Sequence, residues 1–393
     1  MKMKPLEGVK VLEFSTMITA AFASMMMAEQ GARVIKVEPI DMGDPMRYVG
    51  SSKGGISALF ANCNRGKESI RINLKDEAGQ ALIRELAKDA DVIVHNFRPG
   101  VMDSLNLGSE KLRDLNPGLV YVAISGFGVE GPLANAPAYD PIIQAHSGMT
   151  ASQSFETPSF VRNLMCDKIT AYTAVQAITA ALLVREKIGE GQHIDLSMLD
   201  AGLFFIFPDG FMNNTLLDDD IAPQPLLADL IYELTLTKDG VITTSAATEA
   251  QRAGVMRALG REDLLTDERF NSFEKLVANL GEFRGELEEA FTQFSTDDIL
   301  KKLHENDVPV AKCLGYEEVL TQPQILANET VEVREHPAMG SMRVVRSPAK
   351  FGGERLPATS HSPAHGQHTQ SVLEELGLDS TMISDYTEKG IVL

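Results

Sequence analysis

The chain has 393 residues, which is enough for about two or three domains of ~150 residues each. Hydrophobic residues make up 44% and charged residues 23%, so a largely disordered chain, a collagen and a coiled coil are excluded. With 36 basic and 55 acidic residues the net charge is −19, and such a chain repels nucleic acid and anionic membranes unless a local patch reverses the sign; we therefore expect neither as a partner.

Strands and helices alternate over the first 207 residues. Residues 8–14 predict a strand, and the Ala/Met-rich residues 20–30 predict a helix that Gly31 ends. With a second strand at 32–38, this βαβ unit predicts parallel pairing. The same rhythm predicts helices at 76–88, from Ser109 and from Asp167 to about Lys187, and strands at 91–97, 119–125 and 193–198. The alternation predicts an α/β, doubly wound, Rossmann-like large domain whose first part spans residues 1–207.

The sequence changes character after residue 207. An acidic run at 218–220 and two nearby prolines predict a linker over residues 208–225. A hairpin turned at Asp239-Gly240 is followed by acidic amphipathic segments, which predict a smaller α+β domain over residues 226–325. Its helices are expected around 249–259, 281–293 and 297–305, and beyond it the chain is predicted to be extended from about Val331, with a short helix near 371–376.

The sequence does not support a metal site, a disulfide framework, a signal peptide or a membrane span. The three cysteines are widely spaced and form no Cys/His cluster, so we expect neither a bound metal nor a disulfide framework. The first eight residues lack the apolar core of a signal peptide, and the uncharged run over 14–28 has 15 residues, short of the ~20 that span a bilayer. We therefore expect a cytoplasmic protein.

The first βα turn, residues 15–21, contains no glycine. A dinucleotide-binding turn needs glycines there so that the backbone can approach the pyrophosphate, so NAD or FAD binding is disfavoured. The chain also has no P-loop and no HExxH. These absences argue against the common phosphotransferases and metalloproteases.

Two segments could bind an anionic ligand. Residues 62–75 concentrate four basic side chains in an acidic protein, which indicates either a phosphate-binding stretch or a solvated strand edge. The turn at Asn96, Phe97 and Arg98 follows a buried-looking strand and suits an adenine-plus-phosphate ligand. It could equally be an ordinary Pro-Gly turn with Phe97 in the core.

Asp167 stands at the start of the long predicted helix. An aspartate is a favoured N-cap there, which stabilises a helix by ~1 kcal/mol. The helix dipole also keeps a carboxylate ionised, and an ionised carboxylate can act as a covalent nucleophile. Both interpretations stay open at this point, and the isolated His95, His146 and His304 are expected to be structural.

Many short segments in a fixed order resemble the family III CoA-transferases (CaiB/BaiF type), which include the formyl-CoA/oxalate and carnitine-CoA transferases. The resemblance runs through most of the chain. The matching segments are 5–14, 31–38, 43–47, 64–69, 96–100 and 138–141, then Asp167 with its Ala/Thr-rich helix, 189–192 and 366–369.

The resemblance implies a function and a site. It implies transfer of CoA from a donor acyl-CoA to a small carboxylic acid, with Asp167 as the nucleophile that forms an aspartyl-CoA intermediate. CoA or acyl-CoA is then a substrate, and no metal takes part. By position, the CoA-binding residues would be Ile72, Asn73, Leu74, Lys75, Asn96, Phe97, Arg98, Ala138 and Tyr139.

The resemblance also implies an assembly. The protein would be a homodimer of two interlocked chains. Each large domain would be built from both chain ends, with the small domain between them, so residues 326–393 would form a return linker and the C-terminal part of the large domain.

Some features depart from the family pattern. Some members have a glutamine in the first βα turn where this chain has Ile18, and some carry a run of glycines that is missing here near residues 223–228. The apolar Met17, Ile18 and Met25–Met27 suit a less polar acyl group, although a core position is favoured for the last three. Two alternatives stay open: an α-methylacyl-CoA racemase, whose relatives carry a His-Asp pair where this chain has Tyr139-Asp140, and a non-catalytic CoA-binding protein in which Asp167 is only a cap.

Overall fold

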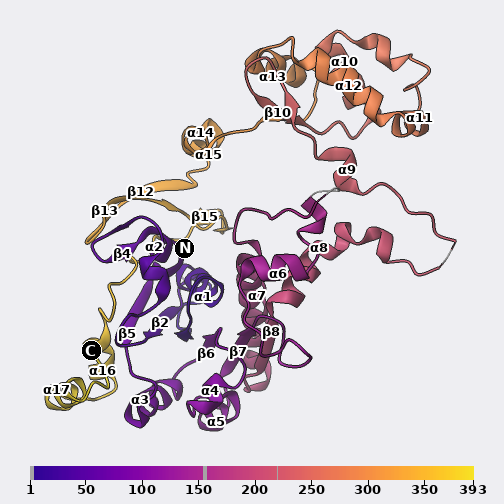
Figure 1. Cartoon of the computed structure of the whole chain (residues 1–393). Helices are drawn as coiled ribbons and strands as arrows, with labels where there is room; N and C mark the ends of the chain where they lie inside the picture. The colour runs from indigo at the N-terminus through magenta and orange to yellow at the C-terminus, as the bar shows by residue number, and fades with distance from the viewer. Residues whose placement is uncertain (1–3, 154–156, 219) are drawn as a thin grey trace. The chain divides into compact units, whose positions relative to one another are not determined.

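The computed structural model describes residues 4–153, 157–218 and 220–393 (Figure 1). Residues 1–3, which belong to the segment expected to lack a signal peptide, lie outside these ranges. So does Asp219 of the predicted linker. The chain forms two compact units: Met1–Phe207 together with Asn328–Leu393, and Pro208–Ala327. The first unit is thus assembled from both ends of the chain. Whether the units are separate folding domains stays a prediction.

The first unit is organised around a six-stranded, wholly parallel sheet with the order β5-β2-β1-β6-β7-β8. From β1 the chain moves outward to β2 and β5, and from β6 it moves the other way to β7 and β8. The strand order therefore reverses between β1 and β6, which is where open α/β sheets bind ligands. The strands are β1 (Lys10–Phe14), β2 (Arg33–Glu38), β5 (Lys67–Arg71), β6 (Val92–His95), β7 (Val120–Ser125) and β8 (His193–Ser197).

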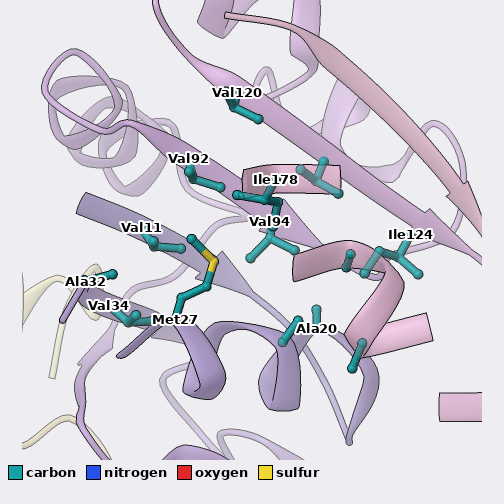
Figure 2. Close-up of a cluster of buried hydrophobic side chains, with 14 of the residues drawn as sticks. Val11, Ala20, Met27, Ala32, Val34, Val92, Val94, Val120, Ile124 and Ile178 are labelled. Atoms are coloured by element: carbon teal, nitrogen blue, oxygen red, sulfur yellow. The ribbon is translucent and has the colours of Figure 1, made fainter. Parts of the chain in front are cut away.

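The four inner strands β2, β1, β6 and β7 contribute to two hydrophobic cores, because successive side chains point to opposite faces of the sheet. Figure 2 shows the first core, where Val11, Val34, Val92 and Val94 pack with α1 (Thr19–Glu29) and α7 (Met165–Ile188). The neighbouring residues Leu12, Ile35 and Ile93 enter the second core on the other face. That face is covered by α3 (Glu77–Ala87), α4 (Val101–Ser104), α5 (Ser109–Leu115) and α16 (Thr369–Glu375). The fold is therefore α/β with helices on both faces, as predicted.

The local signals for helix ends were informative. Asp76 caps α3 by accepting a hydrogen bond from the Ala78 amide at 2.8 Å, as expected. Gly31 ends α1 with φ +106°, and a Cβ at this position would lie 2.6 Å from the Cβ of Lys4. Both features are local, so a short sequence window contains what is needed to predict them.

The C-terminal segment completes the edge of the sheet. The Asn73 amide donates to the Ile391 carbonyl at 2.8 Å, and the His368 amide donates to the Ser69 carbonyl at 2.9 Å. Figure 1 shows α16 beside β5, and Leu373 of α16 is buried in the second core. The edge strand β5 is thus covered by residues that follow it by some 300 positions.

A buried ionic network lies at the carboxyl ends of β1 and β2. Glu13 is fully buried and pairs with Lys36 and with Lys67, each at 2.7 Å. Lys36 also pairs with Asp44 at 2.9 Å. Neither interpretation of the basic stretch 62–75 fits Lys67, because this lysine is neither free for phosphate nor solvated. It is buried as a counter-charge to a carboxylate in the central strand, where an unpaired charge would be costly.

The remaining elements of the first unit are short and irregularly spaced, and most were not predicted. Residues near 331–345 form a hairpin of β12 and β13, consistent with the extended character expected there. The bounds are η1 (Pro45–Tyr48), β3 (Ser52–Lys53), β4 (Ile56–Ser57), α2 (Ala58–Asn64), α6 (Asp140–His146), η2 (Ala151–Gln153), α8 (Met198–Gly210), β12 (Val331–His336), β13 (Gly340–Val345), β14 (Lys350–Phe351), β15 (Glu354–Arg355) and α17 (Ser380–Glu388).

The second unit is a small α+β structure. The predicted hairpin is present as β9 (Thr235–Leu236) and β10 (Val241–Thr244), and β11 (Val310–Lys312) adds an unforeseen third antiparallel strand. The three predicted helices are α10 (Glu249–Leu259), α12 (Leu280–Phe291) and α13 (Thr296–Glu305). The others are η3 (Met212–Asn214), α9 (Leu227–Ile231), η4 (Glu262–Leu265), α11 (Phe273–Ala278), α14 (Tyr316–Thr321) and α15 (Pro323–Ala327). Within the described ranges, every helix is too short or too polar to cross a membrane.

Candidate active site

A cavity of about 370 Å³ lies at the switch point of the sheet. Its walls come from three neighbouring strand ends: Thr16 and Met17 after β1, residues 96–99 after β6, and residues 124–126 at the end of β7. The loop 134–141 and the start of α7 close the remaining sides. Because the carboxyl ends of parallel strands meet here, residues far apart in the sequence share one pocket.

The cavity brings together six of the predicted site residues, namely Asn96, Phe97, Arg98, Ala138, Tyr139 and Asp167. The segment Ile72–Lys75 does not line it, because it follows the outermost strand β5. Ile72 is buried in the second core and bridges to Val392, whereas Lys75 is exposed. A role of Ile72, Asn73, Leu74 and Lys75 in binding CoA stays a prediction.

Asp167 is the carboxylate that faces the cavity. It is the third residue of α7, and Leu164 occupies the N-cap position, so the interpretation of Asp167 as the cap is wrong. Its backbone amide donates to Oδ2 of Asp140 at 3.0 Å, and its Oδ1 accepts a hydrogen bond from the hydroxyl of Thr19. The side chain is half-buried, which leaves it accessible from the cavity.

The electrostatic environment of Asp167 differs from the expectation based on the helix dipole. Burial raises its pKa from 3.8 to about 6, and the nearby Asp140 carboxylate adds to this effect. The Thr19 hydrogen bond and Lys168 oppose the rise in pKa without cancelling it. Desolvation therefore outweighs the Thr19 hydrogen bond and Lys168, and the carboxylate is mainly ionised at pH 7 with only a small margin.

Asp140 has a structural task in this site. It is buried, and its Oδ1 accepts a hydrogen bond from Nε2 of Gln144 at 2.6 Å. Gln144 in turn accepts from the Val161 amide and donates to the Asn163 carbonyl, so the pair ties α6 to the segment that leads into α7. Asp140 thereby fixes the helix start that carries Asp167.

No histidine is among the residues that line the described part of the cavity. His95 is buried behind it, and burial lowers its pKa to about 4. His146 is exposed and packs its ring against Phe127. The neighbouring Tyr139 is 70% exposed at the cavity mouth. The cavity therefore offers Asp167 without a histidine base beside it.

The three residues after β6 have distinct surroundings. Both polar atoms of the Asn96 side chain bond the backbone of Thr16, with Oδ1 accepting from its amide at 3.0 Å and Nδ2 donating to its carbonyl at 2.8 Å. Phe97 packs at the edge of the second core and also lines the cavity. Arg98 is exposed at the cavity wall and forms no ion pair within the described residues.

Other residues of the site were missed or misjudged from the sequence. Thr19 belongs to no motif, and Asp44 lies in the matching segment 43–47 but was given no role. Their importance rests on contacts with Asp167 and with the backbone of Met17. Met17 lines the cavity as an apolar residue. Ile18 does not, because its side chain is buried among Phe60 and other residues of a separate cluster, so the suggestion that Ile18 contacts the acyl group is wrong.

Metal ligands do not gather in the described residues. No group of three or more His, Cys, Asp or Glu side chains among them could hold a metal ion.

The sheet and the cavity define an α/β protein with a cavity at the switch point, lined by the half-buried Asp167 and the buried Asp140. The family model "CoA-transferase family III" matches residues 6–369. The chain is 31% identical to human succinyl-CoA:glutarate CoA-transferase, over 99% of this chain and 90% of that protein. It is 32% identical to acetyl-CoA:oxalate CoA-transferase of Acetobacter aceti, over 89% of this chain and 90% of that protein. A solved structure of a CAIB/BAIF family protein from Brucella suis superposes with a TM-score of 0.84 at 30% identity, covering 95% and 100% of the two chains.

The chain belongs to CoA-transferase family III and is an enzyme that transfers CoA. Enzymes of this class use acyl-CoA as a substrate, and the fold matches solved structures of the family. The interpretation as a non-catalytic CoA-binding protein is therefore set aside.

Proposed function

We propose that the enzyme moves CoA from a donor acyl-CoA to a small carboxylic acid through a covalent intermediate on Asp167. The observation that supports this most is the placement of Asp167, an accessible carboxylate facing a cavity at the switch point of the sheet. Its pKa of about 6 leaves it ionised at neutral pH and thus able to attack.

The chemistry proceeds by two exchanges. An oxygen of Asp167 attacks the thioester carbonyl, the C–S bond breaks, and a mixed anhydride and a CoA thiolate result. The thiolate then attacks Cγ of Asp167, which releases the donor acid as a carboxylate and leaves an aspartyl-CoA thioester. The acceptor carboxylate attacks Cγ of this thioester, the C–S bond breaks, and a second mixed anhydride and a CoA thiolate result. The thiolate finally attacks the acceptor acyl carbon, which gives the acceptor acyl-CoA and regenerates the Asp167 carboxylate. The thioester is conserved throughout, so no ATP is consumed, and water must be kept from the anhydride.

The proposed CoA contacts follow the cavity wall. Arg98 supplies an exposed cation suited to a phosphate, Phe97 supplies an aromatic face, and Ala138 and Tyr139 form the opposite side. Two relatives are named for glutarate and oxalate, which supports a small carboxylic acid as the acceptor. The three free cysteines fit the proposed cytoplasmic location.

We also propose that two chains form an interlocked homodimer. Helices α7 and α8 expose large apolar side chains to water in the single chain. They include Phe204 (82% exposed), Phe205, Tyr172 and Leu183. Exposed apolar surface of this kind is typical of subunit contacts. The racemase alternative is not favoured, because inversion needs two positioned acid/base groups and the cavity lining within the described residues has no histidine.

The test combines loss of activity with chemical trapping. Asp167→Asn and Asp167→Ala should abolish transfer while CoA still binds, because removing an essential nucleophile costs many orders of magnitude in rate. After the wild-type enzyme has reacted with acyl-CoA and then with hydroxylamine, mass spectrometry should locate the modification on Asp167. A folded Asp167→Asn variant with normal turnover, or a label on another residue, would refute the proposal.

A further inference from the structure

We infer that the Thr19 hydroxyl is the donor that holds Oδ1 of Asp167 through the transfer, so that Oδ2 is the oxygen that attacks the acyl-CoA. This inference rests on the proposed nucleophilic role of Asp167. Thr19 is thus a positioning residue for the reacting carboxylate, and it belongs to no motif in the sequence.

The contacts of the Asp167 carboxylate support these different roles of its two oxygens. Thr19 is the first residue of α1, it is 2% exposed, and it lines the cavity beside Asp167. Its hydroxyl donates to Oδ1, whereas no donor bonds Oδ2 within the described residues. The backbone amide of Asp167 is fixed separately by Asp140 at 3.0 Å. The helix start and one carboxylate oxygen are therefore both held, and the other oxygen is free to react.

Thr19 is itself placed by a clamped loop. Residues 15–18 connect β1 to α1. The side chain of Asn96 forms hydrogen bonds with both the backbone amide and the backbone carbonyl of Thr16. The Met17 amide donates to Oδ1 of Asp44 at 3.1 Å, and Asp44 is held by the buried Lys36 at 2.9 Å. Met17 has φ +62°, a left-handed conformation that L-residues adopt rarely. A loop in this conformation needs such external support, which two neighbouring strands provide here.

The same hydroxyl is aligned for the later steps. When Oδ2 has formed the anhydride, Oδ1 becomes the carbonyl oxygen of the aspartyl group. Attack of the CoA thiolate on Cγ then develops negative charge on Oδ1, where the Thr19 donor already lies. Donors aimed at such an oxygen before the reaction stabilise the transition state most. One hydroxyl therefore serves the free carboxylate and the acyl intermediate.

The primary test compares Thr19→Val with Thr19→Ser, since valine keeps the shape and loses the hydroxyl while serine keeps the hydroxyl. We expect Thr19→Val to lower kcat by about 10- to 100-fold, the factor that corresponds to a hydrogen bond to a charged group, with little change in the KM for acyl-CoA. The acid limb of the rate profile should move to higher pH, because the hydrogen bond that stabilises the ionised form is lost. Thr19→Ser should restore most of both properties.

Thr170→Val is the matched control. Thr170 is buried three residues after Asp167, and its hydroxyl bonds the Cys166 carbonyl at 2.7 Å within the same helix. The substitution removes a buried hydroxyl near the nucleophile but leaves the contacts of the Asp167 carboxylate unchanged. The acid limb of the rate profile should therefore stay at the same pH. If Thr19→Val leaves kcat and the rate profile unchanged while Asp167→Asn is inactive, the inference fails and the proposed function stands. If Asp167→Asn is active, both fail.

A second variant tests the clamp and covers the case in which Thr19→Val does not fold. Asn96→Asp keeps an acceptor for the Thr16 amide but loses the donor to the Thr16 carbonyl. If the loop acts through Thr19, this variant should also lower kcat. The acid limb is not compared for this variant, because a new carboxylate at the cavity wall raises the pKa of Asp167 by its charge alone. In a double-mutant cycle with Thr19→Val the two losses in kcat should be strongly non-additive. Additive losses, or a higher KM for acyl-CoA with normal kcat, would contradict the clamp.

Discussion

The carboxyl group of Asp167 has the environment of a reactive group. Burial and the Asp140 carboxylate raise its pKa to about 6, whereas an exposed aspartate titrates near 3.8. Groups with such perturbed pKa values gather at functional sites because the protein arranges burial and neighbouring charge around them. At the residue scale, pH is therefore a direct probe of the mechanism.

We predict that kcat/KM falls as the pH drops through about 6. Only the ionised form of Asp167 attacks, and its raised pKa places the loss of that form near pH 6. The measurement is a rate profile between pH 4.5 and 8, with unfolding followed by circular dichroism at each pH; these limits bracket the pKa by about 1.5 to 2 pH units. A folded enzyme whose rate stays flat down to about pH 4.5 would contradict the raised pKa of the attacking carboxylate.

Glu13 supplies a second prediction at this scale. Burial favours its neutral form, yet Lys36 and Lys67 outweigh burial and lower the pKa from 4.5 to about 2. Its contribution to stability is therefore present above pH 4.5 and is lost as the pH falls from 4.5 toward 2. Glu13→Gln should lower the free energy of unfolding at pH 7 by about 3–5 kcal/mol, because it leaves buried lysines without their counter-charge.

Urea unfolding at pH 7 measures this loss. Glu85→Gln is the control, since Glu85 forms an exposed pair with Lys88 and its loss should cost at most about 1 kcal/mol. Equal effects of the two substitutions would mean that the buried network does not stabilise the fold.

At the scale of single elements, the sequence was most informative where the determining contacts are local. The alternating valines and leucines, the cap at Asp76 and the stop at Gly31 are all visible in short windows. The basic stretch around Lys67 was misjudged because its partner Glu13 lies 54 positions away. Thr19 was missed for the same reason, since it meets Asp167 across 148 positions. The pocket was partly predictable, because its motif residues follow strand ends.

Helix α16 in the C-terminal segment provides a prediction at the scale of single elements. Leu373 is 1% exposed and lies in the second core, so Leu373→Ala should lower the free energy of unfolding by about 2–5 kcal/mol. Met382→Ala in the neighbouring helix α17 is the control, because Met382 is 45% exposed. Chemical denaturation of both variants checks this. If the Leu373 variant were as stable as the control, α16 would not be part of the fold's cooperative core.

At the scale of the whole molecule, we predict a dimer that persists on dilution. The apolar side chains on α7 and α8, with Phe204 82% exposed, need a covering surface, and interlocked chains could separate only after unfolding. Sedimentation at sub-micromolar concentration should give about twice the chain mass of 42.8 kDa. A monomer that appears reversibly on dilution would contradict the interlocked dimer.

The assembly of one unit from both chain ends has a consequence for biosynthesis. The edge strand β5 and the second core are completed by Leu373, Ile391 and Val392, and this C-terminal segment is translated some 300 positions after β5. The nascent chain therefore carries an open parallel sheet edge until these residues have been synthesised, whereas Pro208–Ala327 is contiguous and is fully translated before them. Unpaired strand edges bind chaperones and other copies of the same chain. The period between synthesis of β5 and synthesis of the segment that covers it is thus the interval in which this protein is most exposed to aggregation.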